Sequence, residues 1–346
     1  MEVSSIRSTT TYLKLEDQSH VGEARRLAIS YAGDLGFDDT DRGRIALVVT
    51  EAGTNAVLHG AGGEALLRSP ADGDGPLELL VIDRGPGIAD VAKALQDGYS
   101  TAGTPGTGLG AALRMSDTFD LYSTPTIGTV LYARFVPQFG GRAGSAGGRL
   151  DELEIGEVCL PMRNEIVCGD AWVTRRSGHT DLVMVADGLG HGPDAAEAAR
   201  RAVAVFEASR DQSPALLISE IHGALQSTRG AAVAIASLDH EIAQVRYAGV
   251  GNISGTIVHG STTRSMVSLN GTVGHEMRKV QEFVYEWPTD GLLVMHSDGL
   301  QTHWRLDKYP GLAARHLNVI AAVLYRDFSR GRDDLTVIAA RLPKAD

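Results

Sequence analysis

The sequence predicts a protein of the α+β class with two domains, and three observations support this. The chain has 346 residues, more than the roughly 100–200 residues typical of one domain. A glycine-rich stretch at 140–148 has no apolar periodicity and favours flexible coil. Helix-like and strand-like apolar patterns alternate on both sides of it. We therefore expect a first domain at 1–137, a linker at 138–150 and a second domain at 151–346.

The first half predicts helices layered over an antiparallel or mixed sheet. Helical periodicity and strand-like patterns follow one another, separated by an irregular glycine-rich stretch. The expected elements are helices at 20–35 and 41–59, a strand at 77–83, irregular chain at 84–107, a helix from about 108, and two strands within 119–135.

The second half predicts two stacked sheets flanked by helices. It opens with a strand-like stretch at 153–162. Further strand patterns cover 166–176, 181–187, 231–238, 243–250, 292–297 and 335–342, and helical patterns cover 193–209 and 214–228.

Composition and charge exclude several functional classes. The formal net charge of −11 argues against nucleic acid as a partner. The two cysteines do not form a CxxC pair, so a structural zinc site is not expected. The N-terminus lacks the apolar core of a signal peptide, and no apolar run approaches the roughly 18 residues of a membrane span. We expect a soluble, cytoplasmic protein with neither nucleic acid nor membrane as partner.

The first motif is a polar helix face. Glu51, Asn55 and His59 are spaced four residues apart, which places them on one side of a helix. A carboxylate and a carboxamide so placed can hold water or Mg²⁺. For this motif alone, a solvated polar face is the simpler explanation.

The second motif, Asp83-Arg84-Gly85-Pro86-Gly87, directly follows a buried strand pattern. A carboxylate there can accept a hydrogen bond from the amino group of a base, and glycine permits close approach of a ligand. An ordinary β-turn explains the motif equally well.

The third motif, Gly106-Thr107-Gly108-Leu109-Gly110, leads into an apolar helix and predicts a phosphate cradle. It also fits a loose dinucleotide-binding pattern, but it follows a polar stretch where that pattern requires a strand. The chain contains no Gly-Lys-Ser/Thr, which excludes a Walker-type loop.

In this order the three motifs resemble the ATP site of the GHKL superfamily, over about residues 40–135. The stretch from DRGPGI to TPTIGTV looks like the serine kinases of the stressosome switch, the RsbT type. The resemblance implies that Asn55 coordinates Mg²⁺ with ATP, Asp83 reads adenine, and Glu51 activates or orients the attacking serine. It also assigns the nucleotide loops to Gly85, Gly87, Gly106, Thr107, Gly108 and Gly110. The implied reaction is phosphoryl transfer.

Acids follow apolar strand patterns repeatedly in the second half. They are Asp170, Asp187, Asp298 and the tandem pair Asp333 and Asp334. A single Asp-Gly after a strand is usually a turn, but buried carboxylates in one domain repel one another unless cations neutralise them. A set made only of carboxylates favours Mg²⁺ or Mn²⁺ over zinc.

The segments GD, VADGLGHG, SDG and DDLTV resemble, in family order, the PPM-type phosphatases of the bacterial SpoIIE and RsbX kind, over about 155–342. The implied metal ligands are Asp187, which bridges two ions, the Gly188 carbonyl, Asp298 and Asp333, with Asp170 acting through water and Asp334 as the alternative to Asp333. Glu51 and Asp187 are thus the expected catalytic residues. Arg163 is a weak candidate for binding phosphate, and His191 is either a general acid or a residue that packs at a helix start.

The expected fold is therefore a GHKL α/β sandwich followed by a PPM-type β-sandwich flanked by helices. The expected function is a bifunctional switch that uses ATP, Mg²⁺ and Mn²⁺. It would phosphorylate and dephosphorylate a STAS-domain antagonist or scaffold protein of a sigma-factor pathway. In the alternative, the first half is an anti-sigma-type binding module for a sigma factor or a pathway phosphatase, fused to an active phosphatase. A third possibility is a scaffold with degenerate sites.

Overall fold

The computed structural model describes residues 8–70, 73, 75–96, 108–137 and 153–342. They form two compact units. The N-terminal unit contains the described residues from 8 to 137 together with 314–326, and the C-terminal unit contains 153–313 and 327–342. The predicted linker at 138–150 lies outside the described residues. Among the helices of the described chain, none has the length and apolar character needed to span a membrane.

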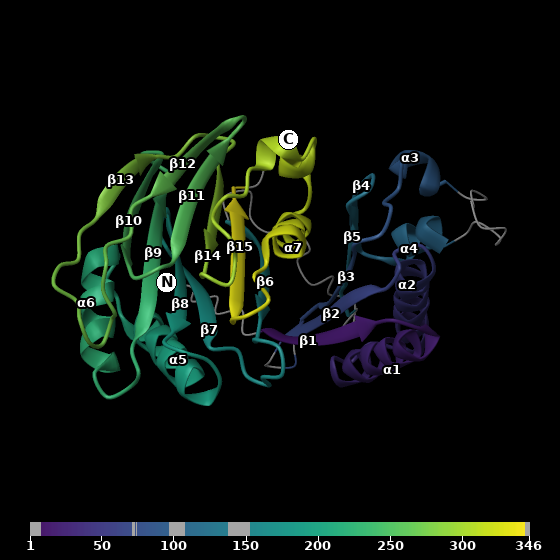
Figure 1. Ribbon diagram of the computed structural model, residues 1–346, viewed down its shortest axis with the longest axis horizontal. Coiled ribbons are helices and arrows are strands. Elements are labelled where there is room, and N and C mark those ends of the chain that lie inside the picture. The colour runs from purple at the N-terminus through teal and green to yellow at the C-terminus, as the bar shows by residue number, and fades with distance from the viewer. Residues whose placement is uncertain (1–7, 71–72, 74, 97–107, 138–152, 343–346) are drawn as a thin grey trace. The chain divides into compact units, whose positions relative to one another are not determined.

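The N-terminal unit is built on a five-stranded antiparallel sheet with helices packed on one face (Figure 1). Its elements are β1 (Ser8–Leu15), α1 (Gln18–Asp34), α2 (Asp39–Leu58), β2 (Gly63–Pro70), β3 (Leu77–Asp83), α3 (Val91–Ala94), α4 (Gly108–Met115), β4 (Thr118–Thr124) and β5 (Gly128–Phe135). The strand order is β1-β2-β3-β5-β4. Both long helices begin after a capping aspartate, Asp17 for α1 and Asp38 for α2, whose carboxylate accepts backbone N–H groups of the first turn.

One apolar core joins α1, α2 and α4 to this sheet. Helix residues such as Ala28 and Val48 are buried against strand residues such as Leu67 and Leu79. Full burial of a Val or Leu side chain contributes about 1.5–3 kcal/mol. This core therefore fixes the position of α2 relative to the end of β3.

The C-terminal unit contains two five-stranded antiparallel sheets, of order β13-β10-β9-β8-β7 and β12-β11-β14-β15-β6. Its strands are β6 (Glu154–Leu160), β7 (Asp170–Ser177), β8 (Thr180–Gly188), β9 (Ala231–Asp239), β10 (Gln244–Val250), β11 (Ser254–His259), β12 (Thr262–Met266), β13 (Phe283–Glu286), β14 (Leu292–His296) and β15 (Leu335–Arg341). Its helices are α5 (Pro193–Ala208) and α6 (Pro214–Leu225), and the chain also forms α7 (Leu317–Phe328), most of which belongs to the N-terminal unit.

The two sheets pack face to face. Val183 and Ala234 of one sheet share a core with Leu293 and Ile338 of the other. Helices α5 and α6 cover the outer face of the first sheet through a second core that includes Phe206. The predicted fold, an α/β sandwich followed by a β-sandwich flanked by helices, is confirmed.

Some predicted elements differ from the structure. The strand predicted at 166–176 begins only at Asp170, because 166–169 form bends. The sequence did not predict β1, β2, β11, β12, β13, α3 or α7. Threonines dilute the alternation in β1, and in α7 every residue from Leu317 to Leu324 is buried.

Candidate active sites

The first polar cluster lies between α2 and the start of α4. Glu51 and Asn55 project from α2, and α4 begins at Gly108. A Cβ atom on Gly108 would lie 2.5 Å from Glu51 Oε2 and 3.8 Å from Asn55 Nδ2. Glycine therefore lets the N-terminus of α4, with its unpaired N–H groups, approach both polar side chains. The structure brings these three predicted residues together.

The predicted adenine-binding residue, Asp83, is the last residue of β3 and is held by the loops around it. Its Oδ1 accepts hydrogen bonds from the N–H groups of Gly85 at 2.9 Å and Thr129 at 3.2 Å. Burial raises the pKa of Asp83, and these two N–H groups partly oppose that increase. A carboxylate oriented in this way is suited to accept a hydrogen bond from the amino group of a base.

The remaining nucleotide-loop predictions have mixed outcomes. Gly87 has a φ of +70°, a conformation that favours glycine, and Gly110 is buried in α4. Gly106 and Thr107 lie outside the described residues. His59 is the exposed C-cap of α2.

Sequence reasoning missed Thr129 as a residue that positions Asp83. The sequence feature that could have indicated this role is the dipeptide Gly128-Thr129, which follows the turn between β4 and β5.

The second cluster begins at the adjacent ends of β7 and β8. Asp170 and Asp187 are directly opposed residues in the antiparallel ladder, so their side chains lie on the same face of the sheet. Asp170 is 5% exposed. Neither of its carboxylate oxygens has a partner of good hydrogen-bond geometry in the described part of the chain, although the hydroxyl groups of Ser297 and Thr336 lie close enough to lower its pKa against the larger effect of burial. Two buried acceptors without well-aligned donors fit a site for cations or ordered water.

The other acids approach this edge from β14 and β15. Asn252 Nδ2 donates to Asp298 Oδ2 at 2.7 Å. Asp334 is buried, and its Oδ1 accepts from the Met162 N–H at 2.8 Å. Asp333 is exposed and accepts from the Asp334 N–H at 3.0 Å. The tandem acids thus differ, since Asp334 is fixed to the backbone while Asp333 remains open toward solvent.

The carboxylates of this cluster repel one another. The pKa of Asp187 is raised by burial and then by the charges of Asp170, Asp298, Asp333 and Asp334. Burial is also the first cause of the raised pKa values of Asp170, Asp333 and Asp334. Such a set of oxygen donors fits hard divalent cations, which would remove the repulsion. Within the described ranges, no three histidine, cysteine or carboxylate side chains are close enough to hold an ion by themselves.

Gly188, the predicted carbonyl ligand, follows Asp187 at the end of β8. Its N–H donates to the Gly169 carbonyl at 3.1 Å. A Cβ atom at Gly188 would collide with the Ala195 carbonyl oxygen of α5. Only glycine therefore allows α5 to pack this close to the acidic edge.

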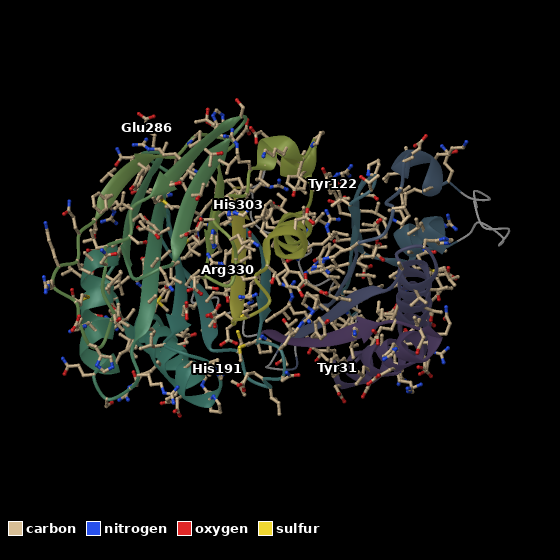
Figure 2. All side chains as sticks on the ribbon, in the orientation of Figure 1. Tyr31, Tyr122, His191, Glu286, His303 and Arg330 are labelled. Atoms are coloured by element: carbon tan, nitrogen blue, oxygen red, sulfur yellow. The ribbon has the colours of Figure 1, made fainter. Side chains whose placement is uncertain are left out.

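Three basic side chains of the C-terminal unit have the chemistry needed to bind phosphate or to donate a proton. Arg163 is exposed. The Nδ1 atom of His191 lies 2.8 Å from Glu165 Oε1, so this histidine has a carboxylate partner just before α5. Arg330, which sequence reasoning missed, is exposed, and its positive charge slightly offsets the burial that raises the pKa of Asp333. Figure 2 labels His191 and Arg330. The sequence feature that could have identified Arg330 is its position three residues before Asp333.

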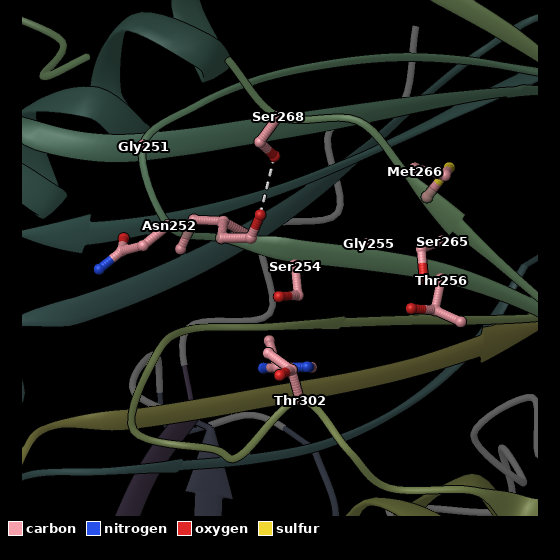
Figure 3. A pocket seen from close by; sticks show the side chains of 11 residues that line it. Gly251, Asn252, Ser254, Gly255, Thr256, Ser265, Met266, Ser268 and Thr302 are labelled. Carbon is pink, nitrogen blue, oxygen red and sulfur yellow. Dashed lines mark hydrogen bonds between the residues drawn. The ribbon is translucent and has the colours of Figure 1, made fainter. Parts of the chain in front are cut away.

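The residues around Asn252 enclose a cavity of about 280 Å³, whose lining side chains are drawn in Figure 3. Hydroxyl groups of Ser254, Thr256 and Ser268 line it, and Ser268 Oγ donates to the Ile253 carbonyl at 2.8 Å. Asn252 lines the same cavity and also holds Asp298. The cavity therefore adjoins the carboxylate cluster.

The raised pKa values predict how the stability of the metal-free protein depends on pH. When folding raises the pKa of an Asp, the folded state binds its proton more tightly than the unfolded state does. The stability gained from this is complete below the ordinary pKa of the group and is lost as the pH rises through the folded-state pKa. With the pKa of Asp170 raised to about 7 and that of Asp187 to about 9, we expect the melting temperature in EDTA to fall between pH 5 and pH 9. Saturating Mn²⁺ should remove this decrease, because cations require deprotonated ligands. A melting temperature independent of pH in EDTA would contradict the repulsion.

Comparison with known proteins places both halves in families. Residues 15–135 match the histidine kinase-like ATPase domain, and residues 177–343 match stage II sporulation protein E (SpoIIE). The serine/threonine-protein kinase RsbT of Bacillus subtilis (strain 168) is 37% identical over 111 residues, which are 32% of this chain and 84% of that protein. The anti-sigma F factor of Halalkalibacterium halodurans is 34% identical over 97 residues, which are 26% of this chain and 66% of that protein.

A solved structure is also similar. It is described as "The bacterial stressosome: a modular system that has been adapted to control secondary messenger signaling". Its chain is 29% identical with a TM-score of 0.51, and the match covers 55% of the present chain and 100% of that chain. The present chain therefore belongs to the family of the RsbT-type serine/threonine kinases, within the histidine kinase-like ATPases, and its residues 177–343 match the SpoIIE family in addition.

Proposed function

We propose that this protein is a bifunctional cytoplasmic switch. Its N-terminal unit phosphorylates serine or threonine on a STAS-type regulator of an alternative sigma-factor pathway, and its C-terminal unit removes the phosphate. The observation that carries this proposal is that one chain holds two separate polar clusters. Glu51 and Asn55 beside the start of α4 form one, with Asp83 at the end of β3 in the same unit, and the acids Asp170, Asp187, Asp298, Asp333 and Asp334 form the other.

In the kinase reaction, ATP with Mg²⁺ supplies the phosphoryl group. Asn55 holds the ion, and Asp83 accepts a hydrogen bond from the adenine amino group. The N–H groups at the start of α4 bind phosphate oxygens. Glu51, beside Gly108, accepts the proton of the attacking hydroxyl. Catalysis then depends mainly on positioning and charge neutralisation.

In the phosphatase reaction, Asp187, the Gly188 carbonyl, Asp298 and Asp333 would hold Mg²⁺ or Mn²⁺. The cations would supply activated water and neutralise charge on the phosphoryl group. Asp170, whose carboxylate oxygens have no partner of good hydrogen-bond geometry among the described residues, positions water. Asn252 orients Asp298 through the hydrogen bond from its side-chain amide.

Arg330 is proposed to bind the substrate phosphate. A hydrogen bond to a charged group contributes about 1.5–3 kcal/mol. We therefore expect Arg330→Ala to raise KM for a phosphoserine protein about tenfold or more, with a smaller change in kcat. Arg163→Ala is the matched control and should leave both constants nearly unchanged. Equal effects of the two substitutions would reject the specific role of Arg330.

The partner class is inferred from the relatives. RsbT, the anti-sigma F factor and the stressosome chain all point to a pathway of regulated phosphorylation around a sigma factor. Two opposed activities on one chain would raise the local concentration of each near a shared partner.

A direct test is to incubate a candidate STAS-domain protein with Mg-ATP and the Asp187→Ala protein, and to locate phosphoserine or phosphothreonine by mass spectrometry. Wild-type protein with Mn²⁺ should then remove the same phosphate. Phosphorylation at one residue and dephosphorylation at a different one would reject the single-site form of the switch.

The second candidate function is an anti-sigma-type ATP-binding module fused to an active phosphatase. The 34% identity to an anti-sigma F factor supports it. In that case a pull-down should recover a sigma factor, and phosphotransfer to any STAS protein should be absent.

A further inference from the structure

The face of the N-terminal sheet opposite α1 and α2 carries buried charged residues. Glu64 and Arg68 of β2 are 9% and 8% exposed. Glu78 of β3 lies on the same face, because Arg68 and Glu78 are opposed in the ladder. Burial of charged groups is costly unless they are paired. Arg68 Nε pairs with Glu78 Oε2 at 3.4 Å, and residues 314–326, which belong to the same unit but come from the far end of the chain, supply further partners.

The first half of this segment is fixed by three residues of the sheet face. Asp120 Oδ2 accepts from the His316 N–H at 2.7 Å, which satisfies a donor at the start of α7. The His316 ring stacks on Tyr132, with ring centroids 4.2 Å apart. Arg68 Nη2 donates to Asn318 Oδ1 at 3.1 Å.

The second half of the segment meets the nucleotide motif. Tyr325 Oη donates to Glu64 Oε2 at 2.7 Å. Arg84 Nη1 donates to Glu64 Oε1 at 3.1 Å, and Arg84 Nη2 donates to the Arg326 carbonyl at 2.8 Å. A guanidinium at this position satisfies a carbonyl near the helix C-terminus and interacts favourably with the helix dipole. The residue that caps α7 is therefore the immediate neighbour of Asp83.

The chain continues from this end of α7 to the tandem acids. Only residues 327–332 separate Arg326 from Asp333. A change in the position of Arg84 therefore acts on a helix end whose continuation carries proposed metal ligands.

We propose that residues 314–326 bind the polar face of the ATP-binding sheet and couple nucleotide occupancy beside Asp83 to cation binding at Asp333, through Arg84 and α7. The inference rests on the proposed function, since it needs a nucleotide site and a cation site on the same chain. Coupling between two binding sites is reciprocal. The cation should therefore change the affinity for nucleotide by the same factor by which nucleotide changes the affinity for the cation.

The test uses the full chain. Hydrolysis of p-nitrophenyl phosphate is titrated with Mn²⁺ at controlled free concentration, with and without a non-hydrolysable ATP analogue. Nucleotide binding is measured separately by fluorescence. For coupling of typical size, the analogue should shift the half-saturating Mn²⁺ concentration by about fivefold or more. Tyr325→Phe and Asn318→Ala should remove most of this shift. Arg305→Ala, which breaks an exposed pair with Asp307, is the matched control and should retain it.

The outcomes separate the two claims. If the wild type hydrolyses substrate and binds nucleotide but its Mn²⁺ half-saturation does not move, the coupling is rejected while the proposed function stands. If either basal activity is missing, the proposed function fails and the coupling fails with it. A second measurement needs no variant: amide exchange of residues 315–326 should slow several-fold when the analogue binds to wild type, and unchanged exchange would overturn the inference.

Discussion

Asp187→Asn is expected to abolish phosphatase activity and, at the same time, to stabilise the metal-free chain. Asp187 lies opposite Asp170 in the ladder, and the charges of four other acids raise its pKa. If Asp187 holds the proposed cations, its replacement would remove several kcal/mol of charge stabilisation in the transition state, so kcat should fall by about 10²–10⁴. At pH 8, below its folded-state pKa of about 9, Asp187 must take up a proton when the chain folds. Asparagine removes that cost and should raise the melting temperature in EDTA by about 2–8 °C.

Phosphatase activity is expected to fall while the melting temperature rises, and this combination makes the prediction specific. An ordinary structural residue would lose activity and stability together. Activity is measured on a phosphoserine peptide with Mn²⁺, and stability by thermal unfolding in EDTA at pH 8. Asp194→Asn serves as control, because Asp194 is an exposed acid of α5 that pairs with Arg229. If Asp187→Asn lowers the melting temperature in EDTA, the account of mutual repulsion is wrong.

Asn55→Ala is expected to eliminate phosphoryl transfer from ATP while leaving phosphatase activity intact. The Asn55 side chain lies beside the start of α4, where the proposed Mg²⁺ would join the phosphates. Without the ion, negative charge on the transferred group is not neutralised, and transfer should slow by about 10²–10³.

Thr54→Ala is the matched control for this prediction. Thr54 is the neighbouring residue of α2, and its hydroxyl makes only a 3.5 Å contact with the Gln18 side chain. Transfer is followed with labelled ATP, and hydrolysis of p-nitrophenyl phosphate reports on the phosphatase. If Asn55→Ala retains wild-type transfer, Asn55 does not hold the ion.

The local parts of both sites were predictable from the sequence because strand ends and helix spacing place their residues. A four-residue spacing put Glu51 and Asn55 on one face of α2, and the position of Asp83 after LELLVI put it at the end of β3. Asp170 and Asp187 could be assigned to strand ends in the same way. Their direct opposition could not, because it depends on the register of β7 against β8.

Features that depend on distant segments were not predictable. Thr129 reaches Asp83 across the sheet, and the backbone N–H of Arg330 donates to the carbonyl of Gly299, the residue after Asp298. Nothing in the local pattern of the segment LNVIAAVLYRDF indicates that Asn318 and Tyr325 meet buried charges on β2. Such contacts follow from tertiary packing rather than from local pattern.

The central claim is that one chain both adds and removes the same phosphate. Its most direct test is the transfer of label from ATP to a candidate STAS-domain protein with Mg²⁺ and Mn²⁺ present, compared for wild type, Asn55→Ala and Asp187→Ala. The account predicts that label appears with wild type, disappears with Asn55→Ala and accumulates further with Asp187→Ala. Absence of label with all three proteins, including the one with a disabled phosphatase, would contradict the kinase half and favour an ATP-binding module that captures its partner without modifying it.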